Sequence, residues 1–183
     1  MRNRKRVLVA DDAANLAQGA RDNGGRIHHE ALLAYGARLG PIVQAGLYYP
    51  RHNGMEAERG QLIALKQAGE FTQVEVRPVR ARPDGTYKSD LDTVITMDVW
   101  EAAVKGAVEV VVLASGDSDF LPLVERLVTQ GIETHVIGPD GATAIELALA
   151  ASFLQMLAHE PSQDTAPFVV SVTAVPIHEN HLD

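Results

Sequence analysis

The most informative part of the chain is the run Val108-Glu-Val-Val-Val-Leu-Ala-Ser115-Gly-Asp117-Ser-Asp119-Phe120. Its first seven residues are mostly Val and Leu, and a short β-branched run of this kind is typical of a strand buried on both faces. The run passes through Ser-Gly-Asp-Ser-Asp into an amphipathic segment at 120–130, which predicts a helix. A strand-to-helix turn of a parallel sheet lies at the carboxyl edge of the strands, where such sheets bind ligands.

The two acids of this turn, Asp117 and Asp119, have two interpretations. In the first they begin the helix: Asp117 or Ser118 accepts hydrogen bonds from free backbone N–H groups, and Asp119 interacts favourably with the positive end of the helix dipole. In the second they bind a metal ion. Capping accounts well for one acid and leaves the second without a necessary role, so the turn alone does not decide between them.

Strand and helix patterns alternate on both sides of this run. The predicted strands are 6–10, 41–48, 73–79, 108–114 and 132–137. The predicted helices are 27–39, 57–67, 91–104, 120–130 and 142–157, and Gly131 is the expected C-terminal cap of the fourth. This alternation predicts an α/β fold with three α/β/α layers and a central, mostly parallel sheet of about five strands.

A chain of 183 residues suits one domain with a real core, which we expect to span residues 1–160. Residues 161–167 have the composition of a linker, and 168–174 alternate in hydropathy. We therefore interpret 161–183 as a C-terminal tail or an edge strand. A strand lent to a second subunit, which would make a homodimer, is an alternative.

The composition excludes several classes of site. The chain has no cysteine, which rules out disulfides, thiolate metal sites and a cysteine nucleophile. Basic residues at 2–6 precede only four apolar residues, at 7–10, before the first acid. That run is too short for a signal-peptide core or a membrane span, so we expect a cytoplasmic protein with no membrane partner.

The charge is unevenly distributed along the chain. The net charge is −8, yet residues 1–88 hold 14 Lys and Arg against 9 Asp and Glu, and residues 89–183 hold 2 against 15. A metal site beside a phosphate-binding surface would produce this asymmetry, and so would ordinary solvated faces.

Further acids occur where the predicted elements meet the carboxyl edge. The first strand ends in Asp11 and Asp12, and the helix at 91–104 carries Asp92 in its first turn and Asp98 on its apolar face. Because parallel strands point the same way, Asp12 can lie beside Asp117, and Asp92 is well placed to join them. Asp98 is equally well explained by hydrogen bonds within the core.

Carboxylates gathered in one pocket repel one another, at a cost of about 4 kcal/mol for a pair 4 Å apart at an effective dielectric of about 20. Either some of them are protonated or a cation neutralises them. Oxygen ligands without His or Cys suit Mg²⁺ or Mn²⁺. Such sites activate water for phosphodiester cleavage.

Together these motifs resemble the NYN domain, the LabA-like branch of the PIN-like nuclease superfamily, over roughly residues 6–157. The resemblance depends on Asp12-x-x-Asn15, on Lys88-x-x-x-Asp92 followed by Asp98, and on Ser115-Gly-Asp117-Ser-Asp119-Phe120-x-Pro122-Leu. The family normally has an apolar residue where Asp11 stands. The resemblance implies a PIN-like, Rossmannoid sheet and a metal-dependent endoribonuclease.

Carried over to this chain, the resemblance makes Asp12, Asp92 and Asp117 catalytic acids that bind Mg²⁺ or Mn²⁺ together with Asp119. Asn15 and Ser115 would orient water or phosphate. Asp11 and Asp98 are secondary candidates for the site.

The expected partner is RNA, most simply a single strand, with DNA as an alternative substrate. Several basic residues near predicted loops could contact phosphates, with Lys88 foremost. The others are Arg51, Arg59, Arg77, Arg80 and Arg82.

Two other functions compete with the nuclease. One is a non-catalytic RNA-binding or assembly module on the same fold. The other is a phosphorelay receiver, which the first strand also resembles. A receiver needs an acceptor Asp at the end of a middle strand, and no acid occurs between Glu30 and Glu56.

Overall fold

The computed structural model describes residues 4–22, 29–51, 56–67, 69, 71–81, 83, 87–139 and 141–157. Six of its strands form one sheet in the order β3-β2-β1-β6-β7-β8, and every neighbouring pair is parallel. The strands of this sheet are β1 (Val7–Asp12), β2 (Ile42–Arg51), β3 (Gln73–Pro78), β6 (Val110–Ala114), β7 (Glu133–Pro139) and β8 (Phe153–Leu157). Two short strands, β4 (Arg80–Ala81) and β5 (Tyr87–Lys88), form a separate antiparallel pair.

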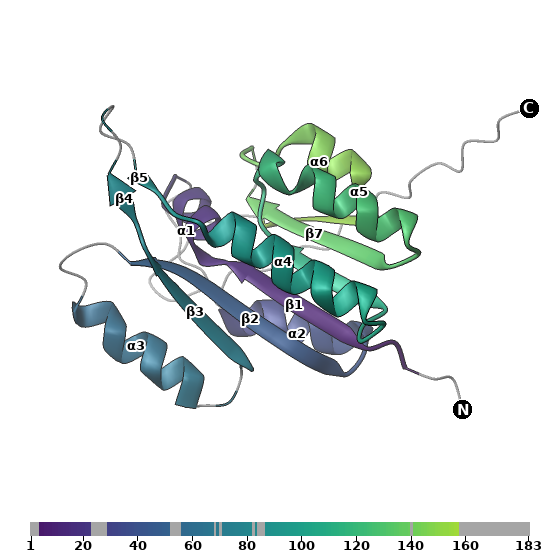
Figure 1. Cartoon of the computed structure of the whole chain (residues 1–183), viewed down its shortest axis with the longest axis horizontal. Helices are drawn as coiled ribbons and strands as arrows, with labels where there is room; N and C mark the ends of the chain where they lie inside the picture. Colours follow the sequence, from purple (N-terminus) through teal and green to yellow (C-terminus); the bar gives the residue numbers. More distant parts are fainter. Residues whose placement is uncertain are drawn as a thin grey trace, which may run out of the picture.

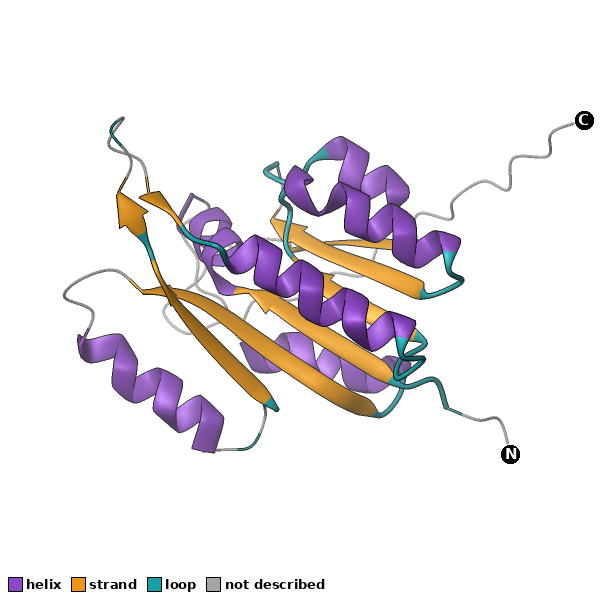
Figure 2. Ribbon diagram, viewed as in Figure 1, coloured by secondary structure: helices purple, strands orange, loops and turns teal. Residues whose placement is uncertain are grey.

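Helices cover both faces of the sheet (Figures 1 and 2). One face packs against α1 (Ala13–Asp22), α2 (His29–Leu39) and α3 (Glu56–Gln67). The other packs against α4 (Leu91–Val104), α5 (Leu121–Thr129) and α6 (Ile145–Ala150). A short 3₁₀ turn, η1 (Ser118–Phe120), precedes α5. Each face has its own apolar cluster, and β6, one of the two central strands, is buried along its whole length, as its sequence predicts.

The chain changes direction in the sheet at β1. From β1 it runs outward to β2 and β3 on one side, and then it returns through α4 to β6, β7 and β8 on the other. The neighbouring strands β1 and β6 therefore form a topological switch point, where the loops after the two strands lead away from each other. The three-layer α/β fold with a mostly parallel central sheet is confirmed. Gly131 is also confirmed at the end of α5, where its φ is +76°.

The predicted helix at 142–157 is wrong. The helix α6 ends at Ala150, and 153–157 form β8, a sixth strand beside β7. The change is stabilised by tertiary contacts: the Ser152 hydroxyl accepts a hydrogen bond from the Thr134 N–H at 3.1 Å, and the Phe153 ring stacks on His135 with centroids 4.5 Å apart. A short apolar run fits a helix or a strand, and here the open edge of β7 decided between them.

Two elements had no counterpart in the prediction, namely α1 and the β4–β5 pair. The predicted tail, 161–183, lies outside the described residues. None of the helices in the described part of the chain is long and apolar enough to cross a membrane.

Candidate metal centre

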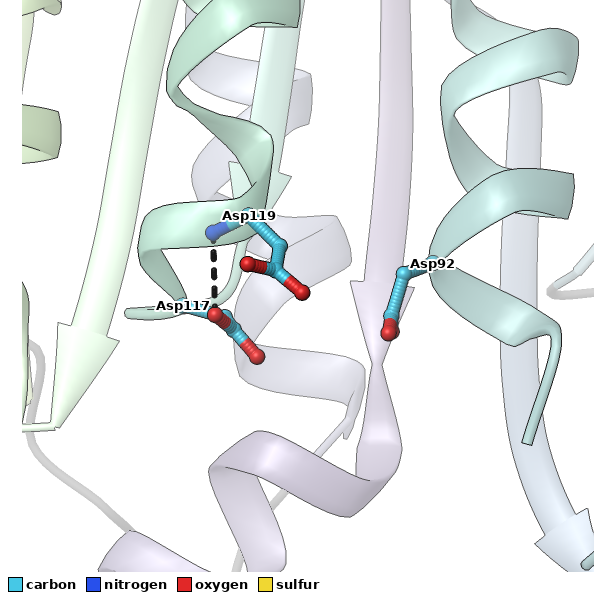
Figure 3. A group of neighbouring side chains, drawn as sticks. All are labelled: Asp92, Asp117 and Asp119. Carbon is cyan, nitrogen blue, oxygen red and sulfur yellow. Dashed lines mark hydrogen bonds between the residues drawn. The ribbon is translucent and has the colours of Figure 1, made fainter. Parts of the chain in front are cut away.

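Three aspartates meet at the carboxyl edge of the sheet, beside the switch point. Asp92 comes from the first turn of α4, and Asp117 and Asp119 come from the loop after β6. Each offers a carboxylate oxygen, and these oxygens lie within 4.8 Å of one another. Figure 3 shows Asp92 facing the other two across a gap between the two elements. Asp92 and Asp117 are half-buried and Asp119 is exposed, so the group is open to solvent on one side.

The loop that carries Asp117 is held by its own hydrogen bonds. A carboxylate oxygen of Asp117 accepts from the Asp119 N–H at 3.0 Å (Figure 3), which caps η1 and brings the two acids together. The Ser115 hydroxyl accepts from the Asp117 N–H at 3.2 Å, and the Asn15 side-chain oxygen accepts from the Gly116 N–H at 2.8 Å. Capping and clustering are therefore compatible, because Asp117 has a second oxygen.

Gly116 is required by close packing. A Cβ atom at this position would lie 2.9 Å from the Thr143 Cα, in the loop between β7 and α6. The Gly116 carbonyl also accepts from the Ala144 N–H at 2.9 Å. The loops after β6 and β7 thus fit together only without a side chain at position 116, which explains the glycine in Ser-Gly-Asp.

Asp12 lies next to this group but is not a member of it. The Ser115 hydroxyl donates to Asp12 at 2.9 Å, and the Asn15 N–H donates to its other oxygen at 3.3 Å. The side chain is almost completely buried, and burial raises its pKa from 3.8 to about 7 despite these hydrogen bonds. The charge of Asp92 raises the pKa further. Ser115 therefore contacts both Asp12 and the Asp117 backbone.

Asp11 lies on the opposite face of the sheet. Consecutive residues of a strand alternate in direction, so Asp12 shares the face of α4 and Asp11 shares that of α2. Asp11 is fully buried, and one of its oxygens lies 2.5 Å from the His29 Nδ1 at the start of α2. Among the described residues the other oxygen has no hydrogen-bond partner. Burial raises the pKa of Asp11, whereas the Asp11 carboxylate raises the pKa of His29 against the effect of burial.

The side chain of Asp98 makes hydrogen bonds that join a helix to the sheet. Its carboxylate accepts from the Tyr48 hydroxyl and from the Gln73 side-chain amide, both at 2.9 Å. Burial and the Asp98 charge raise the pKa of the Tyr48 hydroxyl, so this group donates rather than ionises. Asp98 therefore links α4 to β2 and β3, almost two helical turns from Asp92.

Of the two basic residues predicted to bind substrate, Lys88 and Arg82, only the first lies among the described residues. Lys88 lies in β5, opposite Arg80 of β4. Arg82 lies outside the described residues. Sequence reasoning gave His29 no role, and the signal that could have identified it is Asp11, a buried acid that needs a donor.

The chemistry of the group fits a hard divalent cation. All three ligands are carboxylates, and like charges whose oxygens lie within 4.8 Å of one another repel. An ion bound between them removes that repulsion. Oxygen ligands suit Mg²⁺ or Mn²⁺ better than metals that prefer nitrogen or sulfur.

Comparisons with known proteins agree with this fold. A family model described as the NYN domain matches residues 6–157. A crystal structure of a protein of unknown function from Vibrio parahaemolyticus is similar in fold, with a TM-score of 0.73 and 24% sequence identity over 86% of this chain and 96% of that chain. No curated protein matches.

Proposed function

Because the chain belongs to the NYN domain family, we propose that its three clustered aspartates form the centre of a divalent-metal-dependent endoribonuclease. NYN domains belong to the PIN-like nuclease superfamily, and they are generally nucleases that use divalent metals. We further propose that this member is of the LabA-like branch and that its substrate is single-stranded RNA, with DNA as the alternative. A cytoplasmic location goes with this proposal.

The observation that carries the proposal is the convergence of Asp92 with Asp117 and Asp119, which lie on different elements and more than 20 residues further along the chain. Capping accounts for the position of Asp117, but it does not account for Asp92 on α4 facing it. Three carboxylates this close repel one another, and a cation bound between them would remove that repulsion. Their arrangement at a switch point, where α/β sheets bind ligands, favours a functional role.

In this proposal Asp92, Asp117 and Asp119 would hold Mg²⁺ or Mn²⁺. The ion, when bound, supplies Lewis acidity that activates water and stabilises the negative charge developing on the phosphate. Asp12 is a further carboxylate near this group, and the Ser115 hydroxyl donates a hydrogen bond to it. A proton lost by the attacking water can be accepted by Asp12, or Asp12 can complete the ligand set once the neighbouring charges are neutralised. In the first role Asp12 would be a general base, and in the second it would be a ligand of the ion.

In this proposal Asn15 and Ser115 hold the loop after β6 in place through hydrogen bonds. The Asn15 side-chain oxygen holds the Gly116 N–H, and the Ser115 hydroxyl links Asp12 to the Asp117 backbone. Both residues therefore position the acids, and contact with substrate would use the remaining hydrogen-bonding capacity of the Asn15 amide.

The test is cleavage of a labelled, mixed-sequence single-stranded RNA by the purified protein with Mn²⁺, with Mg²⁺ and with EDTA. The matched control is Asp117→Asn, which keeps the size of the side chain and an oxygen that can still cap η1. We expect metal-dependent cleavage that falls by about 100-fold or more in the variant, since an ion of this kind supplies several kcal/mol to the transition state.

Cleavage that is equal in the variant, or that persists in EDTA, would contradict the nuclease proposal. Tight RNA binding without any metal-dependent cleavage would instead support the competing function, a non-catalytic RNA-binding or assembly module.

A further inference from the structure

Two strands of the sheet extend past the carboxyl edge at which the three aspartates lie, which we call the acidic edge. The last residue of β1, Asp12, pairs with Tyr48 of β2, but β2 continues for three more residues to Arg51, or about 10 Å at the usual rise of a strand. These residues stay paired with β3, with Arg51 opposite Pro78. The ends of β2 and β3 therefore form a projection on one side of the site, beyond the level at which Asp12 lies.

This projection and the start of β4 together carry three arginines, Arg51, Arg77 and Arg80, which we call the arginine overhang. Arg51 ends β2 and Arg80 begins β4, and both are exposed. Arg77 is half-buried and is held by Glu75, with the Arg77 Nε and a Glu75 oxygen 2.6 Å apart. The Arg51 carbonyl accepts from the Val79 N–H at 3.1 Å, so the chain between β3 and β4 is fixed to the end of β2.

The arginine overhang is connected directly to the acidic group. From Arg80 the chain forms the β4–β5 pair, in which Lys88 lies opposite Arg80, and three residues after Lys88 it enters α4, whose first turn holds Asp92. Figure 1 shows β4, β5, the amino end of α4 and the start of α1 at the same end of the sheet. The elements that carry the basic and the acidic residues thus lie at the same end of the sheet.

Arg51 and Arg80 are exposed, and their described contacts differ from those of several other basic residues. Within the described part of the chain, Arg51 and Arg80 form no ion pair with an acid, in contrast to Lys5, Arg6 and Lys105. A polyanion that approached the three aspartates would be repelled by them, and a cation between them neutralises only part of that charge. A substrate with several phosphates would therefore bind where exposed guanidinium groups lie at the same end of the sheet as the acids, since these groups donate paired hydrogen bonds to phosphate oxygens.

We propose that the arginine overhang binds the phosphates of an RNA strand on one side of the bond that is cleaved at Asp92, Asp117 and Asp119. This inference rests on the proposed nuclease function and adds the path of the substrate. The strand enters across the ends of β2 and β3, and its contacts there are to the backbone, so the overhang contributes affinity without reading sequence.

The test measures binding separately from cleavage. The probe is a fluorescein-labelled mixed-sequence single-stranded RNA in EDTA, titrated in the Asp117→Asn background at several salt concentrations. The variant Arg51→Ala/Arg80→Ala is compared with Arg4→Ala/Arg38→Ala, which removes the same charge from exposed residues at the opposite, amino-terminal edge. The single variants Arg51→Gln and Arg80→Gln are titrated in the same way. Thermal unfolding curves check that each variant protein is folded.

We expect the overhang variant to bind about tenfold more weakly, with the slope of log K against log salt reduced by about 1.4, since each lost phosphate contact on a single strand contributes about 0.7. Each single variant accounts for about half of that change in slope. The control variant binds within about twofold of its parent. A DNA of the same sequence shows the same loss, because phosphates are common to both polymers; a loss confined to RNA would overturn the assignment to phosphates.

The two proposals fail in different ways. Metal-dependent cleavage with a KM that is equal in the wild type and in Arg51→Ala/Arg80→Ala would overturn the overhang and leave the nuclease intact. Salt-sensitive binding that depends on Arg51 and Arg80, without cleavage, would overturn the nuclease function while supporting this binding surface.

Discussion

Asp11 and Asp12 are neighbours in the chain, yet the structure places them in opposite environments. Asp12 faces α4 and lies beside Asp92, Asp117 and Asp119, and it accepts hydrogen bonds from the Ser115 hydroxyl and the Asn15 N–H. Asp11 faces α2 and contacts His29, and no other described donor reaches its second oxygen. Two consecutive acids at the end of a strand therefore belong to two different environments, because successive side chains of a strand point to opposite faces of the sheet. The predictions below test that separation.

The largest effect we expect is a pH-dependent destabilisation by Asp12 in the metal-free protein. Its folded-state pKa of about 7 lies above the ordinary 3.8, so between these values the folded state binds more protons than the unfolded state. The free energy of unfolding therefore falls as pH rises through this range. From pH 5 to pH 8 the loss is about 3 kcal/mol. Urea unfolding of the wild type and Asp12→Asn at both pH values, in EDTA, measures it.

In Asp12→Asn this part of the pH dependence should disappear, and the variant should be more stable than the wild type at pH 8. Asp11→Asn serves as the comparison. An unchanged pH dependence in Asp12→Asn would mean that the carboxyl group of Asp12 is solvated, against the burial described above.

The next effect is stabilisation by Mn²⁺. An ion that binds only the folded protein adds about 3 kcal/mol at a concentration 100 times its Kd, which for a chain of this size raises Tm by roughly 5–10 °C. We expect the increase in wild type and in Asp11→Asn, and its loss in Asp92→Asn. Differential scanning fluorimetry with increasing Mn²⁺ at pH 7.5 is the measurement. An equal increase in Asp92→Asn would place the ion elsewhere.

A smaller effect concerns the pair on the other face. Asp11→Ala removes the partner of a largely buried imidazole and should destabilise the protein by about 2 kcal/mol. His29→Ala should have a similar effect, and the double variant should cost less than the sum of the two, because the residues act as one pair. Denaturant unfolding of all four proteins completes the cycle. Strict additivity would contradict a direct Asp11–His29 interaction.

The smallest effect is expected from Ser115→Ala, which removes the hydroxyl that donates to Asp12. The loss of one hydrogen bond should cost about 1 kcal/mol. Since that bond lowers the pKa of Asp12, the pKa should rise further above its wild-type value in the variant. An NMR titration of the Asp12 carboxyl carbon follows this change. A fall in the pKa would show that Ser115 does not stabilise the ionised form.

Much of the fold follows from local patterns. The helix at 91–104 is observed with the predicted bounds, and the strand before Ser115 is buried at every position. Both segments have a hydropathy pattern that fits only one type of element, and both occupy the expected place in the fold. The region 142–157 was mispredicted because Phe153 and its neighbours fit either element, and their contacts with Thr134 and His135 are made only in the folded chain.

The site was predictable to a similar degree. Asp92, Asp117 and Asp119 were named as metal ligands from the sequence and the family resemblance, and the structure brings these three together. It leaves Asp12 beside them, hydrogen-bonded to Ser115, and the sharing of an ion by Asp12 stays a prediction. The environments of Asp98 and Asp11 required the fold, since their partners Tyr48 and His29 lie on other elements.

The sequence by itself determined that a parallel sheet would form and that acids would follow its central strands, because hydropathy periods and residue types are local properties. Only the tertiary structure decided which of these acids meet. Strand order placed the loop after β6 beside the end of β1, strand alternation separated Asp11 from Asp12, and strand register carried Arg51 beyond the acidic edge. These are relations between segments distant in the chain, and they are set by how the whole sheet packs.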